Sequence, residues 1–235
     1  MHGEHEAFTW LGLIPGLEHY PIHIVTTVFI IGLLCVLGLV ATMKLKAAGE
    51  SALIPEGKLT YRNFFELVAE KLYGFCENVM GQHETEKYFP VIATLFIFVF
   101  SCNLIGLIPG FLPPTENMNV TLAAGLFVFL YYNYQGFKEH GIGYIKHFFG
   151  PVWYMAPILL VIELLSHFFR PMTLALRLRG NIMGDHIILS TFHSLVPYGI
   201  PVIFYGLGLF VAFVQAFVFC LLTMVYISLS TAHDH

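Results

Sequence analysis

The strongest constraint in this sequence is the run from His186 to His233, which contains no Asp, Glu, Lys or Arg. In an ordinary soluble domain about a quarter of the residues are charged, and they cover its surface. Across this whole chain of 235 residues only 11% are charged and 57% are apolar, and the mean hydropathy is +0.74. Such a chain cannot cover a water-soluble fold with charge. We therefore expect an all-α integral membrane protein that forms a single domain over residues 1–235.

Apolar segments long enough to cross the hydrocarbon core of a bilayer recur along the chain. A helix needs about 20 such residues to cross. We expect membrane helices at residues 22–43, 88–112, 119–137, 152–196 and 202–230. The last two exceed the length of an upright crossing, which predicts a strong tilt. For residues 152–196 the alternative is two short spans.

Residues 60–80 carry a different pattern. Apolar residues recur at helical spacing, opposite a face that contains Arg62, Glu66 and Glu70. This pattern predicts an amphipathic helix that lies in the membrane interface. A soluble hairpin arm is the alternative. Further along the chain, Asn119-Val-Thr121 matches a glycosylation sequon, and we interpret Asn119 as the cap of a membrane helix instead.

Basic residues are concentrated at one set of loops. They surround the amphipathic segment and follow the third span: Lys44, Lys46, Lys58, Arg62, Lys71, Lys87, Lys138 and Lys146. The N-terminal tail and the loop of residues 109–118 contain none. The positive-inside rule then predicts an N-terminus outside the cell and a C-terminus in the cytoplasm. The two termini lie on these predicted sides of the membrane only if residues 152–196 cross it once, which favours one tilted helix.

Ionisable residues gather on that tilted helix. They are Glu163, His167, Arg170, Arg177, Arg179, Asp185 and His186. Each costs about 2.5–3.5 kcal/mol at bilayer depth, which marks functional candidates. For Glu163, His167 and Arg170 an intrahelical ion network with snorkelling is an equal alternative.

Arg177 differs from its neighbours on the helix. Its guanidinium stays protonated at any physiological pH, so it acts as a fixed positive charge and cannot relay a proton. Glu163 lies about 21 Å away along a helix, and Asp185 about 12 Å away. Neither is a natural partner, so we expect an acidic group on another subunit to face Arg177.

Asp185 and His186 carry groups that exchange protons, which suits a relay to the outer solution. Gln215, Asn103 and Asn181 fit either an interhelical hydrogen bond or a functional role. The four cysteines are scattered and no His-Glu-x-x-His motif is present, so no metal or cofactor is implied. The small net charge of −4 gives no indication of nucleic-acid binding.

Several segments carry the signature of a known family. They are Pro171-Met-Thr-Leu-Ala-Leu-Arg177-Leu-Arg-Gly-Asn181, Gly184-Asp-His186, Gln215-Ala-Phe-Val-Phe219 and Leu222-Thr-Met-Val-Tyr226, with weaker matches at Asn103-Leu-Ile-Gly-Leu-Ile-Pro109 and Asn119-Val-Thr-Leu122. Over these segments the chain resembles subunit a of rotary F-type ATP synthases, and the likeness extends over most of the chain.

The resemblance implies a non-catalytic stator subunit in the cell inner membrane, next to a rotating c-ring and the b subunits of a peripheral stalk. Two aqueous half-channels would lead protons to the ring and couple their passage to ATP synthesis. The family's essential arginine falls on Arg177, which would attract a ring carboxylate and prevent a proton short circuit. The resemblance implies further roles in proton translocation for Gln215, Asn181, Asp185, His186, Glu163, Asn103 and Asn119.

Three positions depart from the family pattern. Arg179 stands where an apolar or small residue is usual, and Asp185 stands where Gly is common. Gly208 occupies a position that is His in some members, so we expect the proton-carrying group to have moved across to Asp185 and His186. A secondary transporter in which Arg177 binds an anion is the competing function. An intramembrane hydrolase is disfavoured because the sequence lacks its motifs.

Overall fold

The structure is a computed structural model, and it describes residues 9–13, 19–48, 61–141, 156–195 and 199–231. These residues form helices and connecting turns without a β-strand, which confirms the all-α class. The elements are the 3-10 turns η1 (Trp10–Leu13) and η3 (Pro114–Glu116) and the helices α1 (Ile22–Ala48), α2 (Tyr61–Met80), α3 (Gln82–Ile105), α4 (Met118–His140), α6 (Ala156–Leu195) and α7 (Ile200–Thr231).

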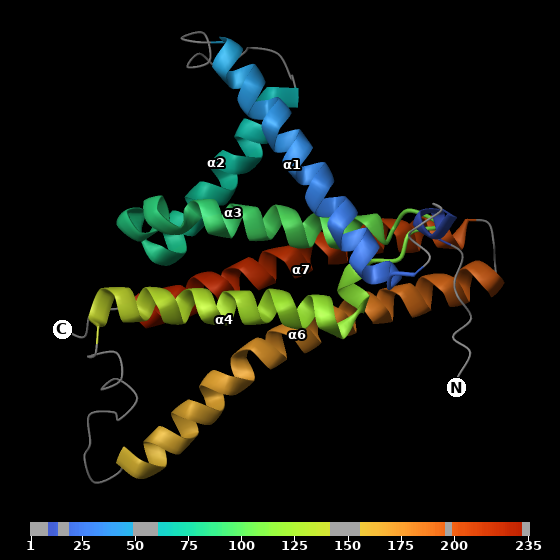
Figure 1. The fold of residues 1–235 in the computed structure, drawn as a ribbon. Coiled ribbons are helices and arrows are strands. Elements are labelled where there is room, and N and C mark those ends of the chain that lie inside the picture. The colour runs from blue at the N-terminus through green and yellow to red at the C-terminus, as the bar shows by residue number, and fades with distance from the viewer. Residues whose placement is uncertain (1–8, 14–18, 49–60, 142–155, 196–198, 232–235) are drawn as a thin grey trace.

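Helices α3, α4 and α7 run side by side, and α6 crosses them obliquely (Figure 1). Their shared core is apolar and includes Tyr88, Tyr132, Leu174, Leu178, Phe219 and Met224, all fully or almost fully buried. Helix α1 leans away from this bundle and touches it near its first half, where Ile30 packs on Cys102 and Ile105 of α3. The bundle therefore consists mainly of α3, α4, α6 and α7.

Helix α6 is continuous over Ala156–Leu195, through Pro171. It approaches α4 closely at Gly125, where an added Cβ atom would lie 2.8 Å from the carbonyl oxygen of Pro171. A side chain at residue 125 would therefore force the helices apart. Residues 152–155 and 196 of the expected span lie outside the described residues.

Helix α2 covers the start of α3 and the middle of α7. Tyr73 packs edge-on against Phe89 at 5.1 Å between ring centroids, and Phe75 packs against Phe217 at 4.5 Å. The apolar face of its second half is thus covered by protein, while Phe65 and Leu67 in its first half remain exposed. The interfacial position of this helix stays a prediction.

The expected span at residues 88–112 has the wrong ends. Helix α3 begins at Gln82, before the expected start. The expected start is too late because the first turns of the helix carry charged residues, which a search for apolar runs leaves out. One of them, Lys87, forms an ion pair with Glu139 of α4. The helix ends at Ile105, where the Gly106 N–H turns back to the carbonyl oxygen of Asn103. The prolines that follow cannot continue a helix.

The expected cap of α4 is also wrong. Asn117 caps the helix, because its side-chain oxygen accepts a hydrogen bond from the backbone N–H of Asn119 at 2.9 Å. Asn119 itself lies in the first turn of α4. An asparagine two residues before a free N–H is the geometry that an N-cap requires.

Three of the described helices are long and apolar enough to cross a membrane: Ile22–Met43 in α1, Gln82–Ile105 in α3 and Val202–Thr231 in α7. This supports a membrane-embedded protein. Helices α4 and α6 are not among them; α6 carries the ionisable residues that the sequence analysis expects at bilayer depth. Their crossing remains a prediction, which their packing against α3 and α7 supports.

Candidate functional site

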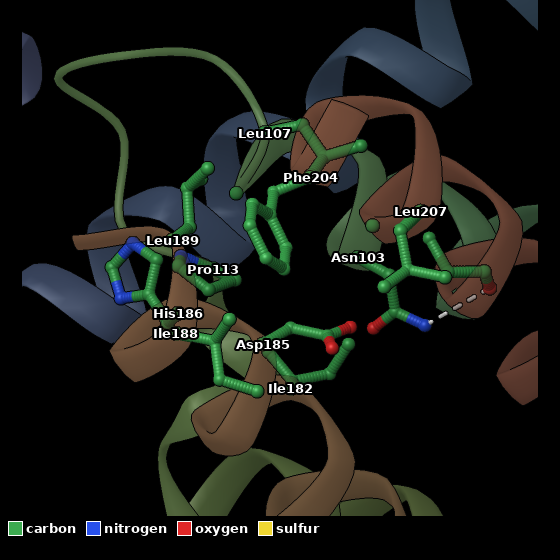
Figure 2. Close-up of a pocket in the computed structure, with 13 residues that line it drawn as sticks. Asn103, Leu107, Pro113, Ile182, Asp185, His186, Ile188, Leu189, Phe204 and Leu207 are labelled. Atoms are coloured by element: carbon green, nitrogen blue, oxygen red, sulfur yellow. Dashed lines mark hydrogen bonds between the residues drawn. The ribbon is translucent and has the colours of Figure 1, made fainter. Parts of the chain in front are cut away.

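A cavity of about 40 Å³ lies between α3, α6 and α7, beside the loop that joins α3 to α4 (Figure 2). Asn103, Asp185 and His186 supply its polar groups. The remaining wall is mostly apolar: Gly106, Leu107, Pro113, Ile182, Ile188, Leu189, Phe204, Leu207, Gly208 and Ala212. A water molecule needs about 10–15 Å³ of such volume and several polar partners. The cavity therefore has room for water next to two groups that exchange protons.

Asp185 and His186 reach this cavity from the last third of α6. Because consecutive residues of a helix point in different directions, their side chains diverge. The Asp185 carboxylate points into the cavity, and the His186 ring lies at its side (Figure 2). The His186 Nδ1 atom lies 3.4 Å from the Oε2 atom of Glu116, which belongs to η3.

Asn103 is 3% exposed and joins three elements at the cavity wall. Its Oδ1 atom accepts a hydrogen bond from the Thr115 hydroxyl at 2.9 Å, and its Nδ2 atom donates to the Ala212 carbonyl of α7 at 3.4 Å. A buried amide costs free energy unless its donors and acceptors are paired. These bonds hold α3, η3 and α7 together around the cavity.

Arg179 has a structural role that its sequence position does not reveal. Its Nε atom donates to the backbone carbonyl of Glu116 at 3.0 Å, and its side chain is partly buried. A charged donor makes this a strong hydrogen bond. Arg179 thereby attaches η3 to α6.

Asn181 and Gln215 are directly paired across α6 and α7. The Asn181 Nδ2 atom donates to Gln215 Oε1 at 2.7 Å. Gln215 is 3% exposed, and its Nε2 atom has no hydrogen-bond partner among the described residues. An unpaired buried donor costs free energy, so this position favours the approach of a hydrogen-bond acceptor.

Arg177 lies on the face of α6 that is not packed against the bundle. Its side chain is exposed, and so are Leu176, Gly180, Asn181 and Met183 around it. Within the part of the chain that the structure describes, no hydrogen bond or ion pair of Arg177 is found. Arg177 does not line the cavity. The fixed cation therefore faces away from the bundle.

Three of the expected site residues line the cavity, Asn103, Asp185 and His186, whereas Arg177, Asn181 and Gln215 do not. Asn119 is exposed at the start of α4 and is not part of the cavity wall. Glu163 lies on α6, and its side chain is outside the described residues, as is that of His167. Arg170 stacks over the Tyr226 ring at 5.4 Å from the ring centroid.

Glu116 and Thr115 contribute to the site and are absent from the sequence-based set. The available signal is that Glu116 is the only acidic residue in the loop of residues 106–117, which also lacks basic residues. In the described residues no group of three or more His, Cys, Asp or Glu side chains is arranged to hold a metal ion.

Comparison of the sequence with known proteins identifies the family of this chain. The family described as ATP synthase A chain matches residues 24–228. ATP synthase subunit a of Bdellovibrio bacteriovorus is 47% identical over 97% of this chain and 100% of its own length. The subunit a proteins of Trichlorobacter lovleyi and Geobacter sulfurreducens are 45% and 44% identical, over 89% and 88% of this chain and 88% and 87% of their own lengths. The chain belongs to the ATP synthase A chain family, the membrane-embedded subunit a of F-type ATP synthases.

Proposed function

We propose that this chain is the non-catalytic, proton-conducting stator subunit of an F-type ATP synthase. It forms two aqueous half-channels against a rotating c-ring and couples proton passage to ATP synthesis. The observation that carries the proposal is Arg177, a permanent cation on the exposed face of α6 with no partner among the described residues.

The charge of Arg177 requires a partner from outside this chain. Exposure of a guanidinium to hydrocarbon costs about 2.5–3.5 kcal/mol on insertion scales, and deprotonation does not relieve that cost. A carboxylate on a neighbouring subunit supplies the missing charge. A ring whose subunits each carry one carboxylate presents a new partner at every step, and the fixed cation releases each in turn.

The cavity around Asp185 supports the outer half-channel. Asp185 follows Arg177 by about two turns of α6, about 12 Å, and the Asn181–Gln215 pair lies between them. Gly208 lines the same cavity from α7, the helix that faces Asp185. This arrangement supports a shift of the proton-carrying group from position 208 to α6.

The remaining parts of the proposal rest on the sequence. Glu163, on the opposite side of Arg177, is proposed for the inner half-channel, and Asn119 for the outer one. The N-terminus is proposed to lie outside the cell inner membrane and the C-terminus in the cytoplasm. The b subunits of the peripheral stalk are the proposed partners besides the ring, and no cofactor takes part.

A secondary transporter that binds an anion at Arg177 is less well supported. Such a site needs polar groups that converge on the ligand inside one chain. Arg177 is exposed and does not line the cavity, whereas the Asp185 carboxylate does, and His186 beside it contacts the Glu116 carboxylate.

Passive proton uptake by vesicles tests the proposal. Vesicles that contain the membrane sector, with the ring and the b subunits, are expected to take up protons when a potassium diffusion potential is imposed. Vesicles that contain this chain alone are expected to conduct no protons, because the ring carboxylates that join the two half-channels are missing. A pH-sensitive dye inside the vesicles measures the uptake. Equal conduction by the chain alone would contradict the proposal.

A further inference from the structure

We propose that Glu116 is the outermost proton-exchanging group of the cavity and passes protons between the outer solution and His186. This inference rests on the proposed function, since it assigns a new residue to the same path. Neither the sequence pattern nor the resemblance points to Glu116. The structure places it there through η3.

The position of Glu116 suits transfer between solvent and cavity. Its Oε2 atom lies 3.4 Å from His186 Nδ1, and the side chains of both residues are 33% exposed. Both therefore contact solvent and each other. His186 also lines the cavity that holds the Asp185 carboxylate (Figure 2). Glu116 thus contacts His186, and His186 and Asp185 both line a cavity that has room for water between them.

Two hydrogen bonds fix the turn that carries Glu116, and neither involves the Glu116 side chain. Arg179 binds the backbone carbonyl of Glu116, and the Thr115 hydroxyl binds Asn103. Pro113 and Pro114 are buried beside them. Because these contacts already hold η3 against α6 and α3, the carboxylate of Glu116 is not needed as an anchor. Its charge can be removed while the loop stays in place.

The transfer is balanced in protons and charge. A proton from the outer solution binds the Glu116 carboxylate and forms the neutral acid. The acid gives that proton to Nδ1 of neutral His186, which leaves a carboxylate and an imidazolium ion. The imidazolium loses the proton on its other nitrogen to water in the cavity, next to Asp185. A flip of the imidazole ring then turns its unprotonated nitrogen toward Glu116, and one proton has moved inward.

The test removes the charge of Glu116 from the assembled membrane sector. Glu116→Gln is expected to lower passive proton conduction about fivefold, less than the 10²–10⁴ of an obligatory acid–base group because water also reaches His186. Glu116→Asp keeps a titratable carboxylate and is expected to conduct at most of the wild-type rate. In a His186→Gln background, Glu116→Gln is expected to cause no further loss.

Glu139→Gln is the matched control. Glu139 is also an ion-paired, partly exposed carboxylate, and it binds Lys87 at the opposite end of α4. Conduction by this variant is expected to equal that of the wild type.

Two results would overturn the assignment of Glu116. One is wild-type conduction by Glu116→Gln; the other is an equal loss in Glu116→Gln and Glu116→Asp together with less assembled sector, which indicates an anchor. Failure of the proposed function has a different signature. Normal ATP-driven pumping by an Arg177→Ala complex would contradict the proposed function itself, regardless of the result for Glu116→Gln.

Discussion

Replacement of Arg177 by alanine is expected to abolish ATP-driven proton pumping by inverted vesicles that contain the whole ATP synthase. ATP hydrolysis by the detached head is expected to continue, because the head does not contain this chain. The reason is the permanent charge of Arg177. Without it, a ring carboxylate loses the cation that stabilises its ionised form, and protons pass directly between the half-channels. Quenching of a pH-sensitive dye measures pumping, and phosphate release measures hydrolysis.

Arg170→Ala is the control for the loss of a cation from α6. The Arg170 guanidinium stacks over Tyr226 inside the chain, so it is not the charge that faces a ring. Pumping by this variant is expected to persist. Normal pumping by Arg177→Ala, or an equal loss in both variants, would contradict the role that we propose for Arg177.

The double variant Asp185→Asn, His186→Ala is expected to lower passive proton conduction about tenfold or more, since positioned acid–base groups contribute about 10²–10⁴ to proton transfer. Both side chains line the cavity, and the variant removes both groups that exchange protons there. A potassium diffusion potential across vesicles with the membrane sector drives the flux, and an internal pH dye reports it.

Ser190→Ala serves as the control on the same helix. Ser190 is exposed, donates to the Ile187 carbonyl within α6 and does not line the cavity. Its conduction is expected to equal that of the wild type. Unchanged flux in the double variant would remove Asp185 and His186 from the proton path.

Much of the fold could be predicted because long apolar runs are explicit in the sequence. The ends of α3 could not. Its first two turns contain Lys87, which pairs with Glu139 of α4, and a search for apolar runs treats such charged residues as loop. Its last turn depends on Gly106, whose N–H returns to Asn103, and on the prolines after it.

The site was predictable where a charge stands in an apolar background. Arg177, Asp185 and His186 meet that condition, and the structure separates them into an exposed cation and a cavity. Glu116 does not meet it, because an acid in a loop looks like ordinary surface. The partner of Arg179 is a backbone carbonyl, which leaves no trace in a sequence.

Disulfide cross-linking from the exposed face of α6 tests the central claim most directly. Leu176 and Met183, which are 49% and 40% exposed, lie on one exposed stripe of α6 beside Arg177, and Leu126 of α4 is exposed to a similar extent, at 48%. Each is replaced by cysteine in a complex without the exposed native Cys35, and a second cysteine is placed next to the ring carboxylate. Leu176→Cys and Met183→Cys are predicted to cross-link to the ring subunit, and Leu126→Cys is not. Cross-linking from Leu126→Cys alone, or from none of the three, would contradict the account in which Arg177 faces the ring.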